Sequence, residues 1–184
     1  TLGLDSPRGA LVSSVIEGGP AESAAIKPGD EGRFALAPET MAIARLERAL
    51  AVTGPGVIRN NQVEIHPFLQ NRKLRAFCAD ADIAMTCYMP LASGAVHGDP
   101  VLAEIGEGLG ATPGQVALAF LMQSGMIVIP SSTSRTHLEE NFAATELTLD
   151  AATMGRVEAL DCGRRIIGRD WGPRSPSRER WRSH

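Results

Sequence analysis

The chain has 184 residues, of which 43% are hydrophobic and 21% are charged, a balance typical of a soluble globular protein. Its net charge of -3 at pH 7 provides no general attraction for nucleic acid or for an anionic membrane surface. No apolar run approaches the length that a membrane span requires. We therefore expect a globular protein that has neither nucleic acid nor membrane as a partner.

The three cysteines, Cys78, Cys87 and Cys162, are irregularly spaced and form neither a metal-binding pattern nor a disulfide framework. Cys78 and Cys87 fall within a predicted helix face and a predicted strand, where a thiol usually acts as a small packing group. A reactive role for one of them is the alternative. We expect no metal site, and we expect the reducing cytoplasm as the location.

Residues 1–30 differ in pattern from the rest of the chain. A β-branched apolar run at residues 9–16 predicts a strand, and a Gly-Gly-Pro turn and a short helix follow it. The string RGALVSSVIEGGPAESAAIKPGD is similar to the middle of a PDZ domain of the HtrA-protease type. It covers only part of such a domain and lacks the loop that captures a peptide carboxylate. We expect a small β-rich fragment that covers an edge, with a working peptide-binding module as the alternative.

Three regions are predicted along the chain. Residues 1–33 contain the PDZ-like fragment and a junction, residues 34–163 form the main domain, and residues 164–184 form a tail. The tail is rich in Arg, Ser and Pro and is expected to be mobile.

The main domain alternates between helical and extended patterns. Predicted strands lie at residues 62–65, 83–88 and 126–129, and the last is apolar throughout, as strands buried on both faces tend to be. Predicted helices begin near Glu39, Asn71, Asp99, Thr112, Ser134 and Asp150. Asp99 precedes a proline, and Thr112 has the T-x-x-Q spacing of a capping box.

This order predicts an α/β fold with three parallel strands that lie side by side in sequence order, because helical crossovers place successive strands next to each other. Val63 and Val128 would then lie near two open edges of the sheet. We expect these edges to be buried under residues 1–34 or against a second copy, which would give a homo-oligomer.

Three blocks in the main domain, NQVEIHPFLQ, CYMPLA and IPSSTSRTHLEEN, occur in an order and spacing that resemble the aldo-keto reductase family. The resemblance covers its C-terminal half, at about residues 41–171. It implies a partial (β/α)8 TIM barrel with three of the eight strands. It also implies the NADPH-dependent reduction of a small-molecule carbonyl, such as an aldehyde, ketone or keto-sugar.

The first two blocks suggest contacts with the nicotinamide end of the cofactor. By resemblance, Gln62 holds the carboxamide, Tyr88 stacks on the nicotinamide ring, and Leu91 with residues 92–94 lies against the pyrophosphate. Taken alone, Gln62 is also consistent with a polar strand residue bonded to a neighbour, and Tyr88 with a half-buried core tyrosine. His66 belongs to a His-Pro pair that is structural in the family, although a general base is the alternative.

The third block places hydroxyls, an arginine and free amides at a helix start, which is an arrangement that binds anions. By resemblance it grips the 2′-phosphate and adenine of NADPH. The candidate residues are Ser131, Ser132, Thr133, Arg135, Glu140 and Asn141. Ser131 replaces a frequent lysine and His137 a frequent arginine, so we expect Arg135 to supply the charge. A well-capped helix without a ligand is the alternative.

Catalysis in this family depends on a tyrosine, a lysine, an aspartate and a histidine from the first half of the barrel. Nothing in residues 1–41 matches their motifs. Tyr88 is the only tyrosine, and Lys27 and Lys73 are the only lysines. We therefore expect no catalytic residue in this chain and little or no turnover, with a non-catalytic remnant or an interaction module as alternatives.

Overall fold

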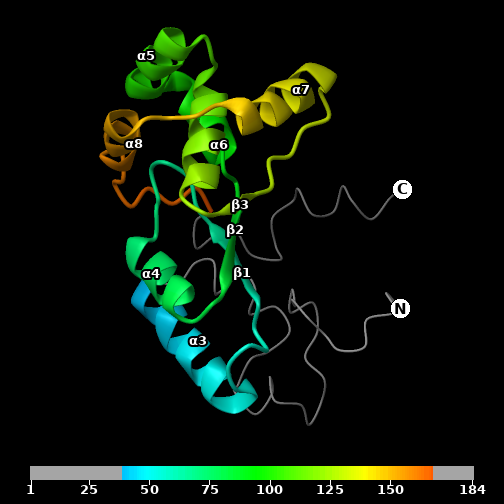
Figure 1. Ribbon diagram of the computed structural model, residues 1–184, viewed down its shortest axis with the longest axis vertical. Coiled ribbons are helices and arrows are strands. Elements are labelled where there is room, and N and C mark those ends of the chain that lie inside the picture. Colours follow the sequence, from blue (N-terminus) through cyan, green and yellow to red (C-terminus); the bar gives the residue numbers. More distant parts are fainter. Residues whose placement is uncertain (1–38, 168–184) are drawn as a thin grey trace.

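A computed structural model describes residues 39–167 (Figure 1). Helices and strands alternate in the predicted order, with two 3₁₀ helices added. In chain order they are α3 (Glu39–Thr53), β1 (Asn60–Glu64), α4 (Arg72–Asp80), β2 (Ala84–Tyr88), η1 (Ala92–Gly98), α5 (Pro100–Leu109), α6 (Pro113–Gln123), β3 (Ile127–Val128), α7 (Arg135–Ala143), η2 (Ala144–Glu146) and α8 (Ala151–Glu158). The PDZ-like fragment predicted at residues 1–30 lies outside the described residues, as do residues 168–184.

The three strands form one parallel sheet in the order β1-β2-β3, which confirms the predicted arrangement. Helices connect consecutive strands, so each strand returns in the same direction beside the one before it. The register pairs Gln62 with Thr86, and Thr86 with Ile127. Because side chains alternate between the two faces of a strand, these three residues share one face of the sheet.

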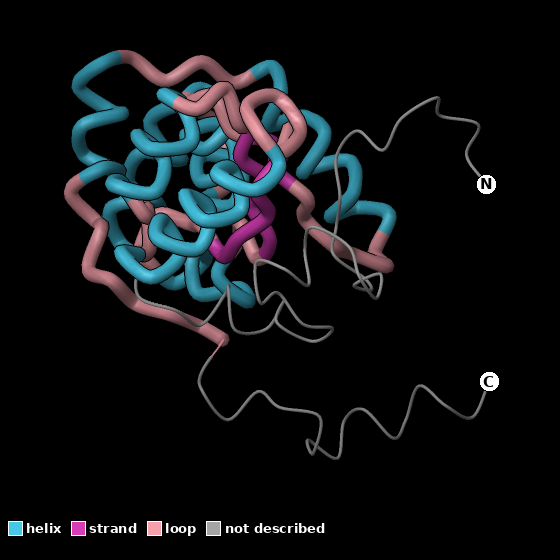
Figure 2. Tube along the Cα trace, turned by 90° about the horizontal axis from the view of Figure 1, so that it is seen from below, coloured by secondary structure: helices cyan, strands magenta, loops and turns pink. Residues whose placement is uncertain are grey.

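Helices cover the opposite face, here called the helix face (Figures 1 and 2). Val63, Met85 and Cys87 are at most 5% exposed on this face. They belong to one core cluster with Leu74 from α4 and Phe120 from α6. Each large apolar side chain buried in this way contributes roughly 1.5–3 kcal/mol to folding.

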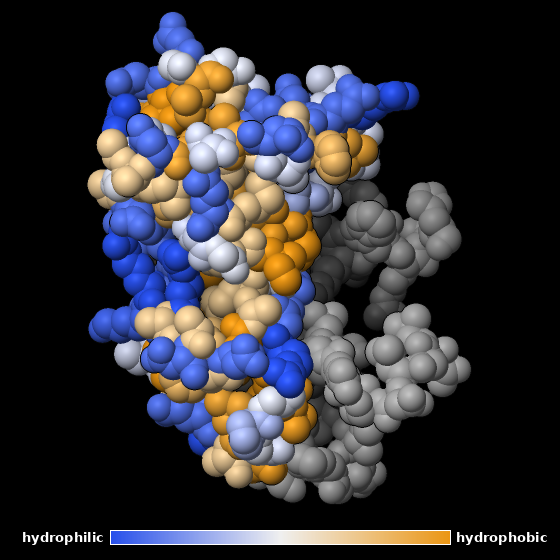
Figure 3. Space-filling view, in the orientation of Figure 1, coloured by the Kyte–Doolittle hydropathy of each residue, from blue (hydrophilic) through white to orange (hydrophobic). Residues whose placement is uncertain are grey.

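The face that carries Gln62, Ala84 and Ile127 is here called the open face. Its side chains are exposed at these three positions. The prediction that residues 126–129 form a strand buried on both faces is wrong, because β3 contains two residues, and Ile127 and Ile129 are 53% and 42% exposed. At β3, the described helices pack only on the helix face, so the open face of this strand is exposed. Figure 3 shows hydrophobic surface at the level of the strands.

The helix starts differ in how well they are capped. Asp99 accepts hydrogen bonds from the N–H groups of Val101 and Leu102, at 3.0 and 2.9 Å. Thr112 and Gln115 form both bonds of the predicted capping box. Ser134 occupies the N-cap position of α7, but its side chain makes no capping bond, contrary to the sequence-based expectation.

Helix α7 is also the least buried of the helices within residues 39–167. None of its residues is buried, whereas seven residues of α6 are. Leu138 and Phe142 are 49% and 75% exposed. Tertiary packing supplies most of a helix's stability, so α7 receives little of it. No helix within residues 39–167 is both long and apolar enough to cross a membrane.

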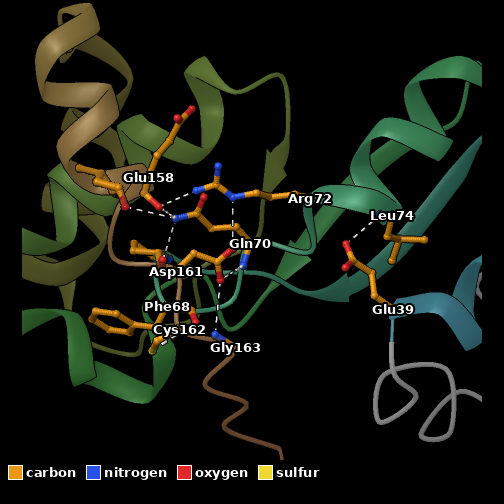
Figure 4. A network of polar contacts seen from close by, with 11 residues as sticks. Glu39, Phe68, Gln70, Arg72, Leu74, Glu158, Asp161, Cys162 and Gly163 are labelled. Carbon is orange, nitrogen blue, oxygen red and sulfur yellow. Dashed lines mark hydrogen bonds and ion pairs between the residues drawn. The ribbon is translucent and has the colours of Figure 1, made fainter.

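A buried amide joins the loop after β1 to the end of α8 (Figure 4). Gln70 is fully buried, and its Nε2 lies 2.9 Å from the carbonyl oxygen of Pro67 and 3.1 Å from those of Val157 and Glu158. Arg72 donates to the carbonyl of Glu158 at 2.6 Å and pairs with Asp161 at 3.3 Å. These bonds fix α8 against the carboxyl end of β1.

The segment after α8, residues 161–167, follows the same loop. The N–H groups of Cys162 and Arg164 donate to the carbonyl of Phe68, at 3.2 and 2.9 Å. The N–H groups of Ile166 and Ile167 donate to the two carboxylate oxygens of Glu64. Residues 164–167, which we expected to belong to a mobile tail, are therefore held against the sheet.

Candidate functional site

The carboxyl ends of β1 and β2 carry the first predicted site residues. Gln62 is exposed on the open face, and its amide makes no hydrogen bond with the other described residues. Tyr88 is half-buried on the same face, and its hydroxyl oxygen is buried. Burial, and then the negative charge of Glu64, raise the pKa of Tyr88 to about 12. Gln62 is thus available to a ligand, and Tyr88 is a poor proton donor.

His66 lies in the structural network and not in an open site. It is fully buried, its Nε2 lies 3.2 Å from Oε1 of Glu64, and its ring packs edge-on against Phe68. Burial raises the pKa of the Glu64 carboxyl, but hydrogen bonds from His66, Ile166 and Ile167 outweigh it and leave the pKa lowered. This position supports the structural interpretation of His66.

The chain bends sharply after β2. Met89, Ala92 and Ser93 have positive φ angles of 52°, 50° and 53°, which residues other than glycine adopt only at a cost in backbone strain. The N–H groups of Ala92 and Gly94 already donate within this bend, at 2.8 and 2.9 Å. Neither of these two N–H groups is therefore free to donate to a pyrophosphate, contrary to the expectation for residues 92–94.

A small pocket of about 60 Å³ lies between η1, α6 and α7. Leu91 and His97 line it on the η1 side. The other lining residues are Thr112, Gly114 and Gln115 of the α6 start, and Ser131, Ser132, His137, Glu140 and Asn141 of the third block. Gln115 donates to the backbone carbonyl of Glu140 at 3.2 Å and so ties α6 to α7.

The pocket brings together five of the nine predicted site residues, namely Leu91, Ser131, Ser132, Glu140 and Asn141. Gln62 and Tyr88 lie elsewhere, on the open face. Thr133 is exposed and does not line the pocket. Arg135 is also outside the lining, because its side chain is 92% exposed and its Nε pairs with Glu139 at 2.7 Å.

Sequence reasoning missed His97, Gly114 and Gln115. The capping box identified Gln115 as part of a helix start, but its second bond to α7 depends on the tertiary fold. His97 carries no local motif, and only the return of the chain in α6 and α7 places it in a pocket. Gly114 matters because a Cβ at this position would lie 2.9 Å from Cε1 of His97.

A second, more open cleft of about 460 Å³ lies between Phe68, η1 and the segment after α8. Two of its charged side chains already have structural roles. Asp99 caps α5, and Arg164 lies over the ring of Phe68, 5.8 Å from its centre. The cleft contains none of the predicted site residues, so we place the candidate site at the smaller pocket.

The cysteines of the described region form no metal site, and no other group of His, Cys, Asp and Glu does so within residues 39–167. Cys78 and Cys87 are buried, and Cys162 is exposed. Burial raises the pKa of the Cys87 thiol to about 12, so this thiol is not a nucleophile at neutral pH.

Comparison with known proteins places the chain in a family. Residues 39–161 match the aldo/keto reductase family. The chain is 45% identical over 122 residues to methylglyoxal reductase DkgB of Escherichia coli O157:H7, covering 66% of this chain and 46% of that protein. It is 36% identical over 127 residues to putative methylglyoxal reductase DkgA of Salmonella typhi, covering 67% and 46%. The chain thus spans about half the length of these relatives.

Solved structures agree with this assignment. A mutant of Gox0644 in complex with NADPH superposes with a TM-score of 0.63 at 37% identity, over 66% of this chain and 45% of that one. A putative 2,5-diketo-D-gluconic acid reductase B gives a TM-score of 0.62 at 32% identity, over 71% and 48%. Because the family match covers well over half of the chain, this protein belongs to the aldo/keto reductase family.

Proposed function

We propose that this chain is the cofactor-binding half of an NADPH-dependent carbonyl reductase, built as a partial (β/α)8 barrel. The observation that carries the proposal is the pocket between η1, α6 and α7. It gathers five residues that the sequence had assigned to the cofactor, although they come from two separate blocks of the chain. The alternative interpretation, a well-capped helix without a ligand, receives less support, because the side chain of Ser134 at the N-cap of α7 makes no capping bond.

The residues present fit the adenosine end of the cofactor. The lining contains hydroxyl and amide groups from Ser131, Ser132 and Asn141, which can donate to phosphate or adenine. Gln62 offers the nicotinamide carboxamide an exposed amide that makes no hydrogen bond with the other described residues, and Tyr88 lies on the same face of the neighbouring strand. When bound, NADPH would supply the hydride for the reduction.

The substrate that we propose is a small carbonyl compound, because the relatives named above include methylglyoxal reductases. We propose that turnover by the 184-residue chain is near background. Proton donation requires an acid near neutral pH, and the pKa of Tyr88, the only tyrosine, is raised to about 12. Lys73 is exposed at the start of α4, and it is not among the charged groups that shift the pKa of Tyr88.

Calorimetry with NADPH and with NADH tests the binding half of the proposal. The 2′-phosphate contacts should make NADPH bind about five- to a hundredfold more tightly. Equal affinities would remove the phosphate-site assignment, and absence of binding would remove the proposed function.

Nicotinamide absorbance in the presence of methylglyoxal tests the turnover half. We expect a rate near background. Brisk reduction that Tyr88→Phe abolishes would show that Tyr88 is the proton donor after all.

A further inference from the structure

Two histidines from different elements line the pocket. His97 comes from η1 and His137 from α7. They are the only lining side chains that can carry a positive charge, and Glu140 is the only acidic one. Arg135, the sequence-based candidate for the charge, is engaged with Glu139 outside the lining. A phosphate in this pocket would therefore find its cationic partners among the two imidazoles.

The position of the His97 ring depends on a neighbouring glycine. Gly114 lies in the first turn of α6 and is buried, and a Cβ there would approach Cε1 of His97 to 2.9 Å. The absence of a side chain at this position leaves the space that the imidazole occupies. The hydrogen bond from Gln115 to the backbone carbonyl of Glu140 holds α7, on the other side of the pocket, against the start of α6.

We infer that His97 binds the 2′-phosphate of NADPH, together with His137 and Ser132, and so determines the preference for NADPH over NADH. The inference rests on the proposed function and extends it to a residue outside the three sequence blocks. An imidazole N–H forms a charge-assisted hydrogen bond with phosphate. The pocket, at about 60 Å³, suits a phosphate-sized group and not a whole nucleotide.

Adenosine 2′,5′-bisphosphate and 5′-AMP are suitable probes, because they differ only in the 2′-phosphate. Calorimetry would use the full chain and the variants His97→Ala, Gly114→Ala and Arg135→Ala. Gly108→Ala is the matched control for Gly114→Ala, since a Cβ at Gly108 meets nothing within 4 Å. Imidazole C–H resonances give a second readout, and the chain has only four histidines to assign.

We expect His97→Ala to weaken the bisphosphate about tenfold while 5′-AMP changes less than about twofold. Gly114→Ala should reproduce this loss in part by displacing the ring, and Gly108→Ala should not. The imidazole resonances of His97 should shift with the bisphosphate and not with 5′-AMP.

Three outcomes would overturn the inference. An unchanged bisphosphate affinity in His97→Ala would exclude His97 from the phosphate contact, and a loss in Arg135→Ala alone would assign that contact to Arg135. Equal weakening of both probes would make His97 an adenosine contact without 2′-phosphate specificity. In each of these cases NADPH binding by the wild-type chain would leave the proposed function intact, whereas a wild-type chain that binds neither probe nor NADPH would remove both.

Discussion

Polar side chains gather in two regions of this molecule, and the two regions use them differently. In and around the loop after β1, Glu64, His66 and Gln70 are fully buried. Glu64 and His66 bond to each other, and Glu64 and Gln70 also form hydrogen bonds with backbone groups nearby. Around the pocket, His97 and His137 are exposed. Buried and bonded polar groups maintain the fold, whereas exposed groups around a pocket are available to a ligand. Both regions contain histidine, so residue type alone does not separate them.

The largest expected effect is the loss of the Gln70 amide. Gln70→Leu should lower the free energy of unfolding by about 2–4 kcal/mol, because the carbonyls of Pro67, Val157 and Glu158 would lose a buried donor. Denaturant unfolding measures this loss. NADPH affinity should stay within about twofold at concentrations and temperatures where the variant is folded. A large selective loss of NADPH affinity in a folded variant would show that the two regions are not separate.

Glu64→Gln should lower stability by about 1–3 kcal/mol at neutral pH, because charge-assisted bonds to Ile166 and Ile167 are weakened. The folded-state pKa of Glu64 is lowered, so its contribution is present above about pH 4.5 and is lost as pH falls through the folded pKa. The variant should therefore lose less stability between neutral pH and acid than the wild type does. Asp150→Asn is a positive comparison, because hydrogen bonds from Thr153 also lower the pKa of this exposed capping carboxyl, so its acid profile should change in the same direction. An identical acid profile for Glu64→Gln and wild type would contradict this account.

The exposed isoleucines of the open face predict an intermediate effect. We predict that residues 1–34 or a second copy bury the sheet edge near Val128, and Ile127 is the exposed residue next to it, so Ile127→Glu should cost about 1–2 kcal/mol of folding or association free energy. Light scattering measures association with a second copy, and denaturant unfolding measures the loss of folding free energy if residues 1–34 are the partner. A wild-type monomer whose variant is equally stable would show that neither partner covers this face.

Gln62→Ala should have the smallest effect. The exposed amide contacts the nicotinamide end, which NADPH and NADH share, so both affinities should fall about three- to tenfold. Calorimetry with the two cofactors measures the change, and His97→Ala provides the contrast because it should affect NADPH alone. A loss confined to one cofactor would exclude a carboxamide contact for Gln62.

Periodicity and capping signals predicted most of the described fold. The order of the elements and the parallel sheet followed from them, as did the caps at Asp99, Thr112 and Asp150. The error at residues 126–129 arose because an apolar run does not reveal which face is covered. The i,i+4 spacing of Arg135 and Glu139 on the predicted helix was compatible with their ion pair, but nothing in the third block could show that His97 joins the pocket from another element.

Hydrogen exchange of the full chain with and without NADPH tests the contrast between the two regions most directly. Binding at the proposed site should slow the exchange of amides in residues 89–98 and 131–141, since a ligand there restrains η1 and the start of α7. Residues 64–72 and 157–167, which are already held by buried hydrogen bonds, should show little change. Protection confined to residues 64–72 and 157–167, or the same exchange with and without saturating NADPH, would contradict the assignment of the cofactor to this pocket.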